Sequence, residues 1–163
     1  MKRIIFTLII AILFTIVVTS CGRASTPTAP SERKTVNGII NEWTKLEDDT
    51  SLMVTNVDID PDYDSNTGIN PGKKVIAVMI KVKNEDNLIK IYKKSDFILK
   101  DSEGAMYQDD QGIKTLSFYT EDVKSGETAE GRMGFVVPKA ETKFTLIYQG
   151  ALGNIAIDLS KGE

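Results

Sequence analysis

The chain has 163 residues, with 20 Lys and Arg against 23 Asp and Glu, and a net charge of −3. It contains no His and a single Cys, which excludes a Ser-His-Asp triad, a Cys-His pair, a His-ligated metal and a Cys-rich zinc site. The acidic balance and the lack of a Lys and Arg stripe argue against a nucleic-acid partner, because binding to phosphates needs clustered cations.

The first twenty residues have the pattern of a cleaved signal peptide. Lys2 and Arg3 precede an apolar run at residues 4–18, which is too short for the roughly 20 residues that span a bilayer. Positions 18–22 are Val-Thr-Ser-Cys-Gly, which resembles the lipobox of bacterial lipoproteins. The resemblance implies cleavage after residue 20 and acylation of Cys21, for example with palmitate.

Lipidation of Cys21 predicts a protein anchored at the extracytoplasmic face of the cell membrane. Two or three acyl chains hold a soluble domain there, since each buried CH2 contributes about 0.8 kcal/mol. An excess of Ile over Leu and of Lys over Arg favours a Gram-positive cell surface. The alternative is an uncleaved signal anchor in which Cys21 is an ordinary thiol.

Residues 21–34 are expected to form the lipidated Cys and a short disordered tether. They are small, polar and proline-containing, and they show no apolar periodicity. Residues 35–163 then form one domain. Its core must hold together without a disulfide, because the only Cys is used as the anchor.

Period-2 alternation dominates the domain and predicts β-strands. The clearest strand covers residues 73–83, with the lysine-rich end of one face in water. Its other face holds Ile76, Val78, Ile80 and Val82. Residues 56–60 alternate as well, with Val57 and Ile59 facing inward. Further short strands are predicted at residues 97–100, 105–108, 133–137, 144–148 and 155–159.

Turn sequences separate these strands. Residues 70–73 fit a type II turn with Pro second and Gly third. Residues 101–104 fit a hairpin in which Gly104 takes the left-handed conformation. Residues 124–127 form a third predicted turn.

Helical spacing occurs at residues 39–46. Ile39, Trp43 and Leu46 are four and three residues apart, which fits one short helix or an irregular segment. The position of the first strand is therefore left open.

Short motifs follow one another along the domain in a definite order. They are residues 82–84, residues 95–101 with Gly104 and Tyr107, residues 125–127 with Gly131, residues 135–138 and residues 144–148. This order resembles the telokin-like superfamily of secreted bacterial domains, which includes the mycobacterial immunoprotective extracellular antigen, over residues 42–160. The resemblance implies an all-β fold, an immunoglobulin-like antiparallel β-sandwich, with no established enzymatic activity and no agreed ligand. It supplies no catalytic residue, and Asn84 is interpreted as a strand-end cap.

Three functions are compatible with these features. The first is a non-catalytic binding module of the cell envelope, which holds a peptide, an envelope protein or a wall component. The second is a structural or surface-display accessory lipoprotein. The third and least favoured is a carboxylate-based hydrolase, because no spacing among the acidic residues singles out a catalytic pair.

Aromatic side chains gathered on an exposed face would mark a ligand surface. Trp43 and Tyr63 are the candidates, together with Tyr92, Tyr107 and Tyr119. Exposure of Trp43 beside two of the tyrosines favours binding, whereas burial of all of them favours display.

Alternating carboxylates form the candidate metal site, for calcium, and no other cofactor is expected. They are Asp58, Asp60, Asp62 and Asp64. Ser65 and Pro71 stand where an EF-hand needs Gly and a bidentate Glu, so the EF-hand pattern fails. Glu47, Asp48 and Asp49 would complete a different site if their strand pairs with this loop. A solvated strand end explains the four residues without a cation and is the preferred interpretation.

Replacing Cys21 by Ser is expected to release the processed protein from membranes, because no acyl chain can then be attached. Fractionation of cells that express the wild-type and Cys21→Ser chains measures this. A Cys21→Ser protein that still sediments quantitatively with membranes after signal processing contradicts the lipoprotein interpretation.

Overall fold

The computed structural model describes residues 33–60, 72–109 and 121–162, and the fold below is that of these residues. The predicted signal peptide, Cys21 and the tether up to residue 32 lie outside them, so the boundaries at residues 20 and 34 stay predictions. Within the described residues no helix is long and apolar enough to cross a membrane.

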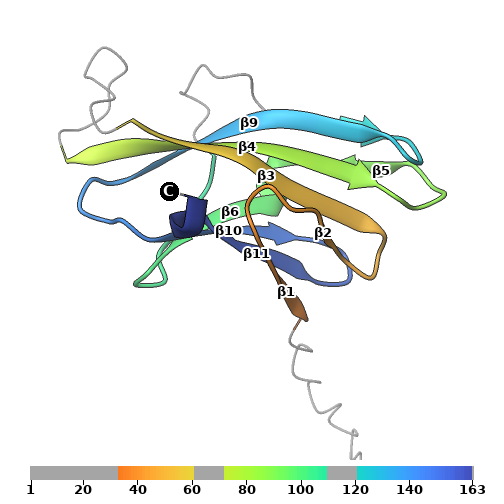
Figure 1. Cartoon of the computed structure of the whole chain (residues 1–163), viewed down its shortest axis with the longest axis horizontal. Coiled ribbons are helices and arrows are strands. Elements are labelled where there is room, and N and C mark those ends of the chain that lie inside the picture. The colour runs from red at the N-terminus through yellow and green to blue at the C-terminus, as the bar shows by residue number, and fades with distance from the viewer. Residues whose placement is uncertain (1–32, 61–71, 110–120, 163) are drawn as a thin grey trace, which may run out of the picture. The chain divides into compact units, whose positions relative to one another are not determined.

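Two sheets face each other and form the two layers seen in Figure 1. One sheet has the strand order β2 (Thr44–Lys45), β3 (Thr50–Asp60), β4 (Lys73–Asn84) and β9 (Thr128–Pro138). The other has the order β1 (Thr35–Gly38), β11 (Asn154–Asp158), β10 (Phe144–Gln149), β6 (Phe97–Asp101) and β7 (Met106–Tyr107). The remaining elements are the pair β5 (Lys90–Tyr92) and β8 (Glu121–Val123), and the short 3-10 helices η2 (Lys94–Asp96) and η3 (Leu159–Gly162).

The strand pairing confirms the predicted all-β, immunoglobulin-like sandwich and locates its first strand. Neighbouring strands are antiparallel, except that β1 runs parallel to β11. A parallel pair needs a long connection between its strands, and here nearly the whole domain separates them. The expectation of a purely antiparallel sandwich is therefore corrected at this edge.

The core lies between the inward faces of the two sheets. The alternating residues of β4 from Ile76 to Val82 are buried as predicted, and Lys81 and Lys83 on the opposite face are partly exposed. Burying each large apolar side chain contributes roughly 1.5–3 kcal/mol, so sheet-to-sheet packing stabilises the fold without a disulfide. The largest fully buried side chains are Tyr92, Phe97, Phe135, Leu52, Ile76, Ile80, Leu99, Met133, Leu146, Ile155 and Ile157.

The end of β3 differs from the sequence prediction. Alternation predicts that Ile59 faces inward, but its side chain is 44% exposed. The strand shifts register between Val54 and Asn56, and β2 pairs only with Ser51 and Leu52. At its far end β3 is therefore paired, among the described residues, with β4 alone. A side chain there that points toward the other sheet is covered by a neighbouring strand on one side only.

Residues 39–46 form an irregular segment, which confirms one of the two alternatives for this stretch. Asn41 has a positive φ of 66°, which a continuous helix does not allow. Leu46 is buried, whereas Ile39 and Trp43 are exposed, so the three apolar residues do not share a helix face.

Two of the predicted turns are confirmed. Gly104 has a φ of 93° between β6 and β7. Gly126 has a φ of 77° between β8 and β9, where the backbone N–H of Glu127 donates to the carbonyl of Lys124 at 3.0 Å. In the turn at residues 70–73 the first two residues lie outside the described part of the chain.

The carboxylate of Asp101 closes the β6–β7 hairpin. It accepts hydrogen bonds from the backbone N–H groups of Glu103 at 3.0 Å and Ala105 at 2.8 Å, and from the Tyr107 hydroxyl at 2.7 Å. The Tyr107 hydrogen bond is the main reason that the pKa of Asp101 is below its usual range. The same bond raises the pKa of Tyr107 to about 12.

Replacing Tyr107 by Phe is expected to reduce the loss of stability in acid. Because the pKa of Asp101 is lower in the folded than in the unfolded chain, Asp101 contributes stability above the unfolded pKa of about 3.9. This contribution is lost as the pH falls through the folded pKa. Without the Tyr107 hydroxyl the difference between the two pKa values shrinks, so the free energy of unfolding falls less between about pH 5 and about pH 2.

Urea denaturation at the two pH values measures this change. Ser102→Ala is the matched control, because Ser102 lies in the same hairpin and its side chain does not bond to Asp101. An equal fall in stability for the wild-type and Tyr107→Phe chains would contradict the assigned role of the hydrogen bond.

Candidate functional site

The structure describes two of the four carboxylates in the candidate calcium site, Asp58 and Asp60. Arg132 Nη2 donates to Asp58 Oδ2 at 2.9 Å, and Asn56 Nδ2 donates to Asp58 Oδ1 at 2.9 Å. The charge of Asp58 is therefore balanced by a neighbouring arginine. The other two carboxylates lie outside the described residues, so the calcium hypothesis stays a prediction.

Glu47, Asp48 and Asp49 do not join this end of the sheet. They form the turn that precedes β3, whereas Asp58 and Asp60 lie at the opposite end of that strand. The nearest residues of the two groups, Asp49 and Asp58, are nine positions apart, which at about 3.3 Å per residue is roughly 30 Å. Among the described residues, no three Asp, Glu, His or Cys side chains lie close enough to hold a metal ion together.

The described residues do not form the aromatic surface predicted around Trp43. Trp43 is 45% exposed, but Tyr92 is buried and Tyr107 is half-buried in the β6–β7 hairpin. Tyr63 and Tyr119 lie outside the described part of the chain. Complete burial of these aromatic residues therefore does not hold, and an exposed face that Trp43 shares with Tyr63 and Tyr119 stays a prediction.

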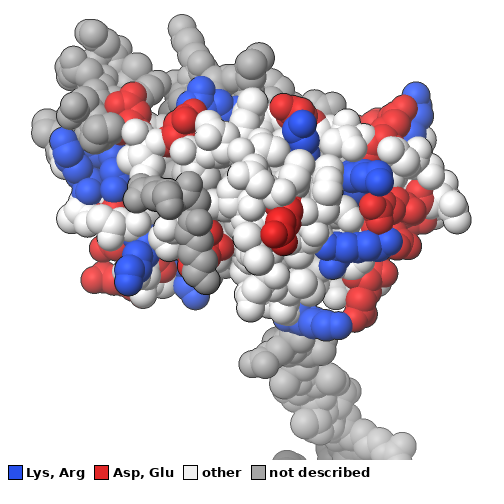
Figure 2. All heavy atoms as spheres, in the orientation of Figure 1, with Lys and Arg blue, Asp and Glu red and all other residues white. Residues whose placement is uncertain are grey.

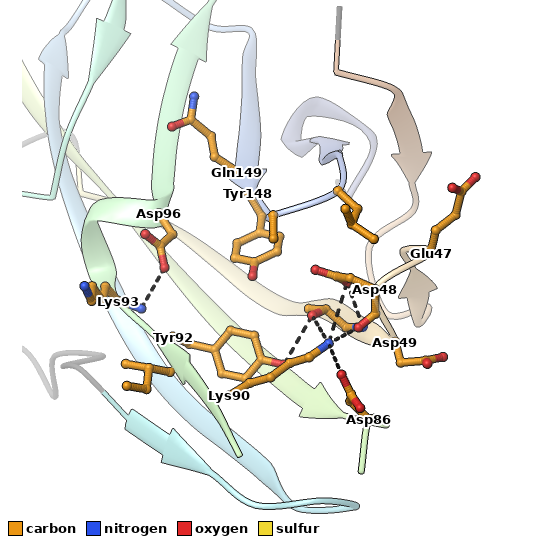
Figure 3. Close-up of a pocket in the computed structure, with 14 residues that line it drawn as sticks. Glu47, Asp48, Asp49, Asp86, Lys90, Tyr92, Lys93, Asp96, Tyr148 and Gln149 are labelled. Atoms are coloured by element: carbon orange, nitrogen blue, oxygen red, sulfur yellow. Dashed lines mark hydrogen bonds and ion pairs between the residues drawn. The ribbon is translucent and has the colours of Figure 1, made fainter. Parts of the chain in front are cut away.

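A pocket of about 700 Å³ instead opens at the end of the sandwich that carries β5, and we call it the loop-end pocket (Figure 3). It lies between the β2–β3 turn, the β4–β5 loop, η2 and the β10–β11 turn. Cavities of this size are typical of ligand sites. It is lined by Glu47, Asp48, Asp49, Thr50, Asp86, Lys90, Ile91, Tyr92, Lys93, Asp96, Tyr148, Gln149, Ala151 and Leu152.

Two tyrosines form the floor of the pocket. The ring centroids of Tyr92 and Tyr148 lie 6.3 Å apart, and the Tyr148 ring lies 5.1 Å from that of Phe97 in the core. Thr50 Oγ1 shares a hydrogen bond with the Tyr92 hydroxyl at 3.3 Å and accepts one from Lys90 Nζ at 3.3 Å. Burial raises the pKa of both tyrosine hydroxyls, so they are neutral hydrogen-bonding groups at physiological pH.

Three carboxylates lie above this floor. Lys90 Nζ is 3.9 Å from Asp48 Oδ1 and 3.7 Å from Asp86 Oδ2, and it also donates to the backbone carbonyl of Asp48. Asp96 accepts a hydrogen bond from the backbone N–H of Lys93 at 2.9 Å and forms no ion pair within the described residues. One lysine thus faces two carboxylates, and the third carboxylate is not ion-paired with any described residue.

Further ion pairs lie outside this inner group, and Figure 2 shows acidic and basic side chains gathered at this end of the domain. Lys34 pairs with Glu47, while Lys45 pairs with Asp49 at 2.8 Å and Glu85 at 2.7 Å. Hydrogen bonds from the lysines lower the pKa of Glu47 and of Glu85. These exposed pairs contribute little to stability, but they balance the charge of the outer carboxylates.

The β2–β3 turn positions Asp48 through its own backbone. Asp48 Oδ1 accepts a hydrogen bond from the N–H of Thr50 at 3.0 Å. The N–H of Leu46 donates to the carbonyl of Thr50 at 2.8 Å, and Asp49 takes a positive φ of 58°. Asp adopts this conformation more readily than most residues, so the sequence suits the turn.

The buried side chain of Asn84 holds the β4–β5 loop. Its Nδ2 donates to the carbonyls of Leu88 at 2.7 Å and Val123 at 2.8 Å, and its Oδ1 accepts from the N–H of Asp86 at 3.0 Å. These bonds confirm the interpretation of Asn84 as a strand-end cap. The loop fixed in this way brings Asp86 and Lys90 to the pocket.

No sequence pattern marks the charged residues of the pocket. Asp86 lies in the β4–β5 loop, Lys90 in β5 and Asp96 in η2, and they meet Asp48 only in the fold. The one available signal is the apolar pair at residues 88–89, which stands in an otherwise polar loop after the capping asparagine.

These groups give the pocket both charged and neutral hydrogen-bonding partners. Asp48 and Asp86 both face Lys90, so this pair is not opposed across a free space as the two carboxyl groups of a glycosidase are. Carboxylates, a lysine and neutral tyrosine hydroxyls can hold a ligand through ionic and hydrogen bonds.

Comparison with known proteins places the chain among domains without an established activity. A family model described as a domain of unknown function, DUF4352, matches residues 39–157. No curated protein matches the sequence.

Three solved structures share the fold at low identity. The ycdA protein of Bacillus subtilis, described as a proposed lipoprotein, has a TM-score of 0.60 and 17% identity, covering 74% of this chain and 39% of its own. The secreted protein MPT63 of Mycobacterium tuberculosis has a TM-score of 0.55 and 15% identity, covering 77% and 98%. An uncharacterized β-sandwich protein of Clostridium difficile has a TM-score of 0.51 and 15% identity, covering 80% and 97%.

These likenesses show the fold alone. The chain spans 39% of the ycdA chain and nearly all of the other two. The likeness to a secreted mycobacterial protein agrees with the fold that the telokin-like resemblance implied.

Replacing Asn84 by Asp is expected to lower the free energy of unfolding by about 2–4 kcal/mol. The change keeps the shape of the side chain but replaces the NH2 donor by an oxygen, which then faces the carbonyls of Leu88 and Val123. Chemical denaturation measures the loss, and amide hydrogen exchange of residues 85–90 measures the loosening of the loop.

Asn87→Asp is the matched control, because it makes the same chemical change at an exposed position of the same loop. Its stability is expected to stay within about 0.5 kcal/mol of the wild type. Similar effects of the two substitutions contradict the role given to the buried amide.

Proposed function

We propose a role for this chain from the geometry of its own residues. The chain belongs to the DUF4352 family of domains of unknown function. It is a non-catalytic binding module of the cell envelope, held at the extracytoplasmic face of the membrane by a lipid on Cys21. Its ligand site is the loop-end pocket.

The pocket itself is the observation that carries this proposal. It is formed by connections from both sheets, and its floor contains the hydroxyls of two tyrosines whose rings pack against the core. The pocket is open to water, so its polar and charged groups are accessible to a ligand. Connections held by a rigid scaffold are where proteins commonly bind ligands.

The proposed location is supported by the N-terminal sequence and by two of the structural relatives. Residues 18–22 have the order of a lipobox after a short apolar run. The ycdA protein is described as a proposed lipoprotein, and MPT63 as a secreted protein.

Site-specific photo-crosslinking in intact cells tests the proposal. A benzoylphenylalanine in place of Leu152 is expected to capture a discrete envelope component, because Leu152 lines the pocket and is 63% exposed. Met106 provides the matched control, since it is 64% exposed on β7 and does not line the pocket. The product is expected at Leu152 and not at Met106.

Equal products at Leu152 and Met106, or no product at Leu152 when the two chains are present in equal amounts, overturn the proposal. The Cys21→Ser chain reports on the anchor separately. Its yield at Leu152 is expected to fall, because the domain is then no longer concentrated at the membrane.

A further inference from the structure

We propose that the loop-end pocket binds a basic side chain, Lys or Arg, of a partner peptide or protein segment in which apolar residues flank the basic one. The inference rests on the proposed binding function and names the chemistry of its ligand.

The charge of the pocket lining favours a cation. The lining contains five carboxylates and two lysines, but two of the carboxylates, Glu47 and Asp49, are paired with lysines outside it. The inner group of three carboxylates and two lysines therefore carries a net charge of −1. Asp48 and Asp86 share the single ammonium of Lys90, and Asp96 has no ion pair within the described residues. Figure 3 shows Asp48 and Asp96 on opposite sides of Tyr148. A second ammonium or a guanidinium between them supplies the missing positive charge, whereas an anion adds repulsion.

The floor offers acceptors for the N–H groups of such a cation. Tyr148 is 5% exposed, and its hydroxyl points into the pocket in Figure 3. Thr50 is the shared hydrogen-bonding neighbour of Tyr148, Tyr92 and Lys90. One threonine hydroxyl has a single proton to donate, so it cannot fill the acceptor positions of both tyrosine oxygens. The Tyr148 hydroxyl oxygen is therefore placed to accept from a cation in the pocket.

Two exposed apolar side chains, Ile91 and Leu152, line the same pocket. Leu88 and Ile89 are exposed on the loop that precedes β5. Exposed apolar side chains beside a polar pocket offer surface that a bound partner can cover. A hydrated metal ion or a simple polyamine buries none of them, and no described group of carboxylates is arranged to hold a metal. A peptide with apolar residues beside its basic side chain covers the exposed Ile91 and Leu152. Burial of these apolar surfaces then stabilises the complex.

Fluorescence anisotropy tests the ligand class, with the full chain held in non-ionic detergent micelles. Three probes carry the same Gly-Gly spacer and neutral dye: acetyl-Leu-Lys-Leu, acetyl-Leu-Glu-Leu and acetyl-Ser-Lys-Ser. The first is expected to bind at least about fivefold more tightly than the second, because the charge opposite the carboxylates is reversed. It is also expected to bind at least about fivefold more tightly than the third, which lacks the apolar contacts. Added salt is expected to weaken its binding.

The double variant Asp86→Asn and Asp96→Asn tests the site. Asparagine keeps a carbonyl oxygen for the backbone hydrogen bonds that Asp86 accepts from residues 87 and 88 and that Asp96 accepts from residue 93. The affinity for the Leu-Lys-Leu probe is expected to fall by at least about fivefold. Glu42→Gln with Glu103→Gln removes the same charge at exposed positions outside the pocket, so it is expected to leave the affinity unchanged.

Binding of the Leu-Lys-Leu probe no tighter than that of the Leu-Glu-Leu probe overturns the inference, as does wild-type affinity in the Asp86 and Asp96 variant. Equal or tighter binding of the Ser-Lys-Ser probe indicates a simple amine as ligand and also overturns it. If these tests fail while the crosslink at Leu152 persists, the ligand class is wrong and the binding function stands. If the crosslink fails as well, both proposals fall.

Discussion

The loop end of the sandwich depends on one buried amide. Asn84 stands at the end of β4, and its side chain makes two donor bonds and one acceptor bond to groups outside the strand. A buried amide is tolerated only where such bonds are made, because each missing one leaves a polar group without water. The end of the strand therefore sets the path of residues 85–90. This path in turn fixes the positions of Asp86 and Lys90.

The pocket joins parts of both sheets through a few further contacts. The N–H of Glu85 donates to the carbonyl of Asp49 at 2.8 Å, which ties the β4–β5 loop to the β2–β3 turn. The rings of Tyr92 and Tyr148 continue into the core through Phe97. The walls are thus connections, but the floor belongs to the core, so the hydroxyls at the base are held as firmly as the sheets themselves.

Each of the three inner carboxylates accepts hydrogen bonds from the backbone of its own segment. Asp48 accepts from the N–H of Thr50, Asp86 from two residues of its loop, and Asp96 from the N–H of Lys93. Local turn chemistry therefore accounts for an aspartate at each position. The negative charge of the pocket arises because three such segments meet at one end of the sandwich, where a single inner lysine faces two of the carboxylates.

The sequence by itself determined the all-β fold, the strands β4, β6, β7, β10 and β11, parts of β3 and β9, and two of the turns, but not β1, β2, β5 or β8. Period-2 alternation depends on a residue and its near neighbours, and so do the left-handed glycines at residues 104 and 126 and the cap at Asn84. Tertiary structure alone decided the parallel pairing of β1 with β11, the exposure of Ile59, the burial of Tyr92 and the convergence of the inner carboxylates. These features depend on which segments distant in the chain become neighbours when two sheets stack, and no local spacing of residues encodes that.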